Sequence, residues 1–269
     1  MNNLFDIACN FSSDRFEKDL NKVIKRAKYN NVTKFLLVSA SLKDAEKVNK
    51  IYQDNKDSCF LTIGAHPHHA NEFNSSSPSE MKRLIDEYKP HSVGETGLDF
   101  FRNISSYEEQ LFAFEEQIRI AIETNLPLFL HQRDAHDDFL RIISKYKNDI
   151  SRAVVHCFTG TQKELDDYLE MEFSIGLTGW ICDERRNIDL RKSLKNIPLD
   201  KLMIETDCPY LLPRTLKPKP KSRRNEPKFL HEIVKMIALN TDYSSTEIIN
   251  QSTKNANRLF NLPIFNNDL

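Results

Sequence analysis

The chain has 269 residues, 39% of them hydrophobic, and a formal net charge of −1. This length suits two small domains or one (β/α)8 barrel, and the balanced charge excludes an overall attraction to nucleic acid, so any polyanion site must be local. The five cysteines form no Cys-x-x-Cys pair, Met1–Asp6 lacks the features of a signal peptide, and no apolar run is long enough to span a membrane. We therefore expect a cytoplasmic protein with reduced thiols and no membrane partner.

Apolar runs bounded by turn residues alternate with segments of helical periodicity. In chain order, strands are predicted at 4–8, 34–38, 59–63, 92–95, 127–131, 153–156, 173–177 and 201–207. Helices are predicted at 14–30, 42–55, from the Ser-rich loop 74–79 to about 88, 107–124, 135–143, 163–170, about 189–196, 227–240 and 244–260. Eight strands alternating with helices, without a dividing linker, predict a single-domain parallel (β/α)8 TIM barrel over residues 1–269; a doubly wound open sheet is the alternative.

Several predicted strands end on a residue that can bind a metal ion. Glu95, His131, His156 and Asp207 follow apolar runs, and His66 comes shortly after the third strand. Because the carboxyl ends of parallel strands meet at one face of the sheet, we expect these side chains to converge. Imidazole with carboxylate suits Mg2+, Mn2+, Zn2+ or Fe, and such an ion can polarise a phosphoryl oxygen and lower the pKa of its bound water.

Two carboxylates close the last predicted strand. Asp207 is best placed to hold or deprotonate the attacking water, and Glu205 is a candidate ligand, base or orienting neighbour. Carboxylates at the end of a buried strand are costly unless a metal ion or hydrogen bonds compensate them. A single acid or histidine is usually structural, but such groups in register on successive strands favour a site. His68 is assigned to the same site as a substrate contact.

The segment 214–224, after the last predicted strand, holds six basic residues and no acidic one. Arginine and lysine near a metal centre make a phosphate-binding surface, although most basic loops are simply solvated. We predict substrate contacts by Arg223 and Arg224 in this loop, and by Arg133 in the loop after the fifth strand. Trp180, near the same face, could stack on bases or pack in the core.

Ordered motifs carry a family resemblance. Over essentially its whole length the chain resembles the TatD-family metal-dependent DNases, through GAHPH at 64–68, GETGLDF at 94–100, LHQRDA at 130–135, VHCFTG at 155–160 and IETDCPYL at 204–211. TGWICDERR at 178–186 and SRRNEP at 222–227 resemble the branch that gives the family its name, rather than its paralogues.

The resemblance implies an amidohydrolase-like TIM barrel, a divalent cation (Mg2+ first, with Mn2+ or Zn2+ as alternatives) and hydrolysis of phosphodiester bonds. For the named branch it implies a 3′-to-5′ exonuclease on single-stranded DNA and RNA, with a role in DNA repair or turnover. By matching positions, Glu95, His131, His156 and Asp207 take the metal and catalytic roles, and His66 lies beside them in substrate binding. No feature of the sequence indicates an oligomer, so a monomer is expected.

The chain departs from the family pattern at the first strand. Many relatives carry His-x-His there, which completes a two-metal site, whereas this sequence reads Asp6-Ile7-Ala8-Cys9-Asn10. One firmly held ion, with a second bound weakly or only with substrate, follows as a hypothesis. Thr96 and Gln132 stand where the family often has cysteine, and neither is needed as a ligand.

Two other functions compete with a nuclease. The same barrel hosts metal-dependent amidohydrolases and lactonases acting on small C–N or C–O substrates. That class usually has the first-strand His-x-His and often a bridging lysine on the fourth strand, where this chain has Ala8, Asn10 and Glu95. A binding protein with a vestigial site is the third possibility, which the intact set of acids and histidines argues against.

Overall fold

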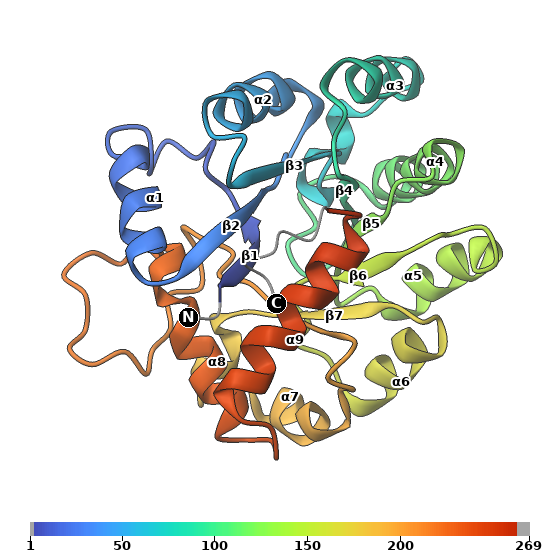
Figure 1. Cartoon of the computed structure of the whole chain (residues 1–269). Helices are drawn as coiled ribbons and strands as arrows, with labels where there is room; N and C mark the ends of the chain where they lie inside the picture. The colour runs from blue at the N-terminus through green and yellow to red at the C-terminus, as the bar shows by residue number, and fades with distance from the viewer. Residues whose placement is uncertain (1–2, 263–269) are drawn as a thin grey trace.

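The computed structural model describes residues 3–262, whose strands form one parallel sheet in which each strand pairs with the next along the chain. Figure 1 shows helices arranged around the outer side of this curved sheet. A parallel bridge between Cys9 and Cys208 joins the first strand to the segment after the last, which closes the predicted (β/α)8 barrel. The strands are β1 (Leu4–Cys9), β2 (Val32–Leu37), β3 (Cys59–Ile63), β4 (Ser92–Asp99), β5 (Leu128–Arg133), β6 (Ala153–Val155), β7 (Ser174–Leu177) and β8 (Leu202–Ile204).

Helices fill the connections between the strands and the segment after β8. The α-helices of the described residues are α1 (Leu20–Tyr29), α2 (Ala45–Asp54), α3 (Ser77–Tyr88), α4 (Tyr107–Thr124), α5 (His136–Ile143), α6 (Gln162–Glu170), α7 (Ile188–Ser193), α8 (Leu230–Ala238) and α9 (Ser245–Leu259). The 3-10 helices are η1 (Leu42–Asp44), η2 (Pro67–Glu72), η3 (Ser144–Tyr146), η4 (Gly179–Cys182), η5 (Leu194–Asn196) and η6 (Pro227–Phe229). Within residues 3–262, no helix has both the length and the apolarity needed to cross a bilayer.

The first helix is shorter than the sequence predicts. It begins at Leu20 rather than at residue 14, because the preceding residues form successive turns. In these turns the Phe16 N–H donates to the Ser13 carbonyl (2.9 Å) and the Asp19 N–H donates to the Phe16 carbonyl (3.0 Å). The other predicted helices lie within a few residues of their observed positions.

Strands β4 and β5 are longer than predicted. β4 continues past Glu95 to Asp99, and β5 continues past His131 to Arg133, because the two strands stay paired as far as Asp99 and Arg133. Glu95 and His131 therefore lie within strands rather than at their ends. The pairing shifts register beside Glu95, and such a bulge redirects the side chain at that position.

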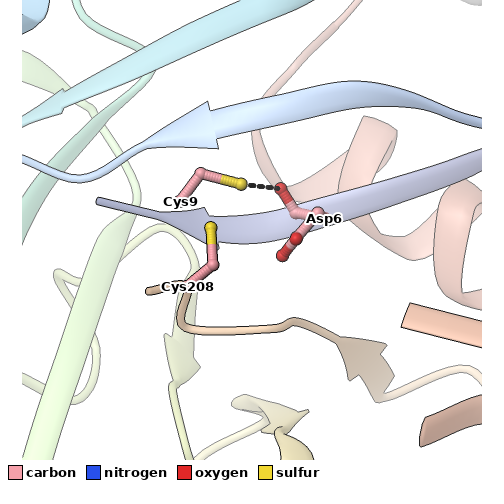
Figure 2. A group of neighbouring side chains, drawn as sticks. All are labelled: Asp6, Cys9 and Cys208. Atoms are coloured by element: carbon pink, nitrogen blue, oxygen red, sulfur yellow. Dashed lines mark hydrogen bonds between the residues drawn. The ribbon is translucent and has the colours of Figure 1, made fainter. Parts of the chain in front are cut away.

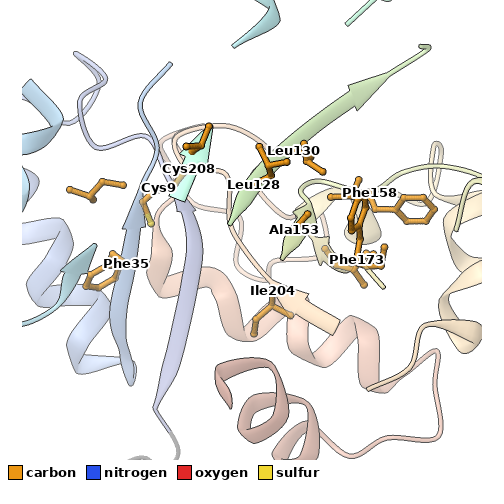
Figure 3. Close-up of a cluster of buried hydrophobic side chains, with 14 of the residues drawn as sticks. Cys9, Phe35, Leu128, Leu130, Ala153, Phe158, Phe173, Ile204 and Cys208 are labelled. Atoms are coloured by element: carbon orange, nitrogen blue, oxygen red, sulfur yellow. The ribbon is translucent and has the colours of Figure 1, made fainter. Parts of the chain in front are cut away.

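Apolar side chains fill the barrel, and α9 covers one end of it. Phe5 and Phe129, inside the barrel, cluster with Leu259 of α9, which crosses the strands in Figure 1. A larger cluster packs the strands against the outer helices, and Figure 3 shows part of it around Phe35 and Ile204. Because α9 packs on β1 and β8 at this end, the opposite, C-terminal end of the strands is left for a site.

Asp6 joins β1 to the segment after β8. Its carboxylate accepts hydrogen bonds from the backbone N–H of Thr206 (2.8 Å) and from the Thr206 hydroxyl (2.5 Å). Figure 2 shows Cys9 and Cys208 beside it, and all three side chains are fully buried. Burial raises the pKa of Asp6 to about 7, against the effect of the hydrogen bonds from Thr206. These contacts fix the backbone immediately before Asp207.

Two buried glutamines of α4 hold the backbone near the C-terminal ends of β3 and β4. The Gln117 amide accepts from the Ala65 N–H (2.7 Å) and donates to the Ala65 carbonyl (3.0 Å). The Gln110 amide makes the same pair of bonds with the backbone of Asp99, at 2.9 and 3.3 Å. The two glutamines are about two helical turns apart, so they lie on one face of the helix. α4 therefore positions the segments that carry His66 and Asp99.

Replacing Gln117 with leucine should destabilise the fold. The substitution leaves the buried N–H and carbonyl of Ala65 without partners, at a cost of about 2 to 4 kcal/mol in the free energy of unfolding. Urea denaturation of Gln117→Leu measures this loss. Gln53→Leu, an exposed glutamine on α2, is the control and should change the free energy by less than about 0.5 kcal/mol. Equal stability of the two variants would contradict the assigned role of Gln117.

Candidate active site

A buried carboxylate lies where three imidazoles meet. Glu95 Oε1 is 2.9 Å from His156 Nε2, 3.0 Å from His131 Nδ1 and 3.4 Å from His66 Nε2. These side chains come from β4, β5 and the segments after β6 and β3. The structure thus brings together four residues that the sequence analysis predicts to converge.

The charges of this cluster depend on one another. Burial opposes ionisation of Glu95, but the neighbouring imidazoles, His156 first, outweigh it and hold the pKa of the carboxyl well below its usual value. Burial likewise opposes protonation of His156, yet Glu205 and Glu95 raise the pKa of this imidazole well above its usual value. Burial lowers the pKa of His66 to about 4, in spite of the Glu95 charge. Positive charge at this point is therefore stabilised by buried carboxylates.

Glu205 lies behind His156 and does not line the cavity beside it. Its side chain is fully buried, 3.3 Å from His156 Nδ1, and it accepts a hydrogen bond of 2.5 Å from the Cys157 N–H. Gly176 leaves the space for it, since a Cβ there would lie 2.8 Å from the carboxylate. Of the three roles predicted for Glu205, this position favours the orienting one, because a carboxylate on the far nitrogen fixes which nitrogen of His156 faces Glu95.

Asp207 lines the same cavity from the segment after β8. This cavity has a volume of about 510 Å3 and opens at the C-terminal end of the barrel. The backbone of Asp207 is left-handed, with φ of 53°, and Asn10 Nδ2 donates to its Oδ1 (2.9 Å). Burial raises the pKa of Asp207 to about 7; His156 opposes this shift, while Glu95 adds to it. Asp207 makes no direct hydrogen bond to Glu95 or its imidazoles among the described residues, but all of them line this one cavity.

Sequence analysis misses two polar residues of the site. Asp99 is buried, with Oδ2 2.8 Å from His68 Nε2 and 3.5 Å from His131 Nε2. Alternation along β4 places residues 95, 97 and 99 on one face, so a strand predicted as far as Asp99 would have identified it. Asn10 follows β1 and lines the cavity, and a neutral amide after a strand carries no signal of a metal site.

The predicted substrate contacts divide into two groups. His66, His68 and Arg133 line the cavity. Arg224 does not: its guanidinium donates to both oxygens of Asp19, at 2.7 and 2.8 Å, and to Glu226 at 2.8 Å.

These ion pairs hold the loop after β8 against the start of α1. Arg223, beside it, is exposed and lines neither cavity described for residues 3–262. A contact of either arginine with substrate stays a prediction.

The donor set fits a divalent cation. Ligand atoms of His66, Glu95 and His131 lie within 4.8 Å of one another. His131 Nε2 is buried and makes no hydrogen bond within the described residues. Imidazole nitrogen and carboxylate oxygen together suit borderline and hard divalent ions. Asp6, Cys9 and Cys208 form another such group, but the Asp6 oxygens already bond Thr206.

Acids and imidazoles gathered at the C-terminal end of a (β/α)8 barrel are the arrangement of a metal-dependent hydrolase. A family model described as "TatD related DNase" matches residues 5–261. The chain belongs to the TatD-related DNase family.

Known relatives match nearly the whole chain. A protein of Erwinia billingiae named "3′-5′ ssDNA/RNA exonuclease TatD" is 44% identical over 260 residues, which is 97% of this chain and 100% of that protein. Among solved structures, a hydrolase TatD family protein from Entamoeba histolytica is similar with a TM-score of 0.86 and 28% identity, covering 96% of this chain and 98% of that one. YJJV, a TatD homologue from Escherichia coli, has the same fold, with a TM-score of 0.88, 24% identity and coverage of 97% and 98%.

Glu205→Gln should weaken metal binding. The substitution removes the charge that orients His156, and loss of such a carboxylate costs about 10- to 100-fold in metal affinity. Calorimetric titration of the variant with Mn2+ measures the effect, with circular dichroism to confirm folding. Glu46→Gln, which removes the same charge from the exposed face of α2, is the control. Equal affinities for the two variants would refute the assigned role.

Proposed function

We propose that this protein is a metal-dependent nuclease that hydrolyses phosphodiester bonds of DNA, and more narrowly a 3′-to-5′ exonuclease acting on single-stranded DNA and RNA. The observation that carries the proposal is the Glu95–imidazole cluster in a cavity that also presents arginine side chains. Membership of the TatD-related DNase family and the name of the Erwinia billingiae relative support the activity and its polarity.

In the proposed mechanism, Glu95, His131, His156 and Asp207 would hold the cation. When bound, a divalent ion polarises a phosphoryl oxygen and lowers the pKa of water. Asp207 accepts the proton of the attacking water, since it lines the same cavity and burial raises its pKa to about 7. Glu205 does not line the cavity, and it acts by holding His156 in place.

Substrate phosphate meets His66, His68 and Arg133 in this proposal. All three line the cavity, and Arg133 supplies a permanent positive charge. His68 is held by Asp99 and therefore presents a fixed ring to the cavity. Contacts with phosphate position the nucleic-acid strand, and they do not discriminate among its bases.

An amidohydrolase or lactonase activity is less favoured. Ala8 and Asn10 replace the first-strand imidazoles that such enzymes usually use, and the Asn10 amide donates to Asp207. For the same reason we propose one firmly held ion, because Asp6, the remaining acid of that strand, is committed to Thr206.

The proposal also covers the metal ion, the oligomeric state, the domain and the cellular role of the enzyme. We take Mg2+ as the ion in the cell, a monomer as the working state, a single domain over residues 1–269, and DNA repair or turnover as the role. A cytoplasmic location is supported by the five free cysteines.

Asp207→Asn should nearly abolish cleavage, although the side chain keeps its size. Loss of the general base is expected to lower the rate by about 10²- to 10⁴-fold on 3′-end-accessible, 5′-labelled single-stranded DNA with Mg2+. Asp57→Asn, an exposed acid before β3 at the opposite end of the barrel, is the control and should retain the parent rate. EDTA should stop the parent and the control alike. Trimming by Asp207→Asn at the parent rate would refute the mechanism.

A further inference from the structure

A second cavity adjoins the catalytic one. It has a volume of about 410 Å3, and Gln132, Arg133, Thr159 and Trp180 line both cavities. Because the two share these residues, a chain whose phosphate lies beside Glu95 can place a neighbouring group in the second cavity. The character of that group follows from the side chains around it.

Aromatic rings border the second cavity, each with an arginine beside it. Phe101 is 56% exposed, and the Arg133 guanidinium lies 3.8 Å from the centre of its ring. Arg186 lies 5.6 Å from the Trp180 ring. An exposed phenylalanine contributes little to folding, whereas a ring with an adjacent arginine is the usual surface on which unpaired bases stack.

Carboxylates outnumber arginines in the lining of this cavity, three to two, and disfavour a phosphate as its occupant. Asp134, Glu164 and Asp189 contribute to the lining and would repel an anion. They accept hydrogen bonds, however, as the exocyclic amino groups of bases require. The cavity therefore suits a neutral, planar group that carries hydrogen-bond donors.

A chain of hydrogen bonds fixes the orientation of the Gln132 amide. Gln132 Nε2 donates to Glu164 (3.2 Å), whose carboxylate can only accept, and to the Tyr168 oxygen (3.0 Å). The Tyr168 oxygen also lies 3.1 Å from His136 Nδ1, and His136 Nε2 lies 2.8 Å from Asp167.

Because these bonds direct the amide nitrogen of Gln132 inward, its oxygen Oε1 has no hydrogen-bond partner among the described residues. Tyr168 is 1% exposed and lines the second cavity, so the floor that orients Gln132 is buried and fixed. Gln132 therefore offers an acceptor where the two cavities meet.

We propose that the second cavity is a subsite for the base of one nucleotide flanking the scissile phosphodiester. Phe101 and Trp180 stack on the base, and Gln132 Oε1 accepts a hydrogen bond from its exocyclic amino group. The subsite rests on the proposed nuclease function, and it gives the enzyme a preference among bases at one position.

Single abasic substitutions test the stacking contact. Short single-stranded DNAs carry an abasic unit at the 3′-terminal or the penultimate position, and kcat/KM is measured for the parent, Phe101→Ala and Tyr29→Ala. Tyr29, 90% exposed on α1, is the control. Loss of the base at one of the two positions should lower kcat/KM about tenfold for the parent and the control. In Phe101→Ala the same loss should cost several-fold less than in the parent, because only the Trp180 and Gln132 contacts are left to lose.

The outcomes separate the subsite from the nuclease function. If the parent and Tyr29→Ala cleave, but base removal costs the same in Phe101→Ala as in the parent, the subsite is wrong and the nuclease stands. If neither cleaves any oligonucleotide with Mg2+, the nuclease function itself fails, and the subsite with it.

A pair of bases tests the Gln132 contact. Deoxycytidine and deoxyuridine differ in whether position 4 is an amino donor or a carbonyl acceptor. At the nucleotide position where loss of the base lowers kcat/KM, the parent should cleave the cytidine substrate about three- to tenfold faster than the uridine substrate. Gln132→Met, which keeps the length but removes the acceptor, should lose this preference while a thermal melt shows it folded. An unchanged preference in Gln132→Met, or none in the parent, would overturn the contact.

Discussion

The site depends on how one buried carboxylate is compensated. Glu95 is removed from water, and an ionised carboxylate in such a position is costly unless positive charge or donors meet it. Three imidazole nitrogens face the same oxygen, so compensation comes from protons on those rings or from a cation held among them. A cation satisfies the carboxylate and several rings at once, which is why this geometry favours a metal centre over a purely structural cluster.

The barrel supplies this geometry through contacts that lie outside the cluster. The β4–β5 pair brings Glu95 and His131 together, and Gly97 allows the close approach, since its φ is +150° and a Cβ would lie 1.8 Å from the His131 carbonyl oxygen. Asp6 and Thr206 fix the backbone that carries Asp207. The chemistry thus rests on strand pairing and buried hydrogen bonds that were already needed to close the fold.

Sequence patterns predict the barrel and the centre of the site because both follow from the alternation of strands and helices along the chain. Apolar runs of strand length separated by amphipathic segments leave few arrangements other than a parallel barrel, whose strand ends meet. The end of β4 does not follow from its pattern, because Glu95, Thr96 and Gly97 interrupt its apolar residues, and a strand that ends at Glu95 omits Asp99. The position of Arg224 was beyond local pattern, since its partners Asp19 and Glu226 become neighbours only in the fold.

Anomalous diffraction from crystals grown with Mn2+ would show whether a cation binds at the Glu95 cluster. We expect one fully occupied ion in contact with the Glu95 carboxylate and with the imidazole of His131 or His156. An ion found only beside Asp6, Cys9 and Cys208, or no ion near Glu95 at saturating Mn2+, would contradict this expectation.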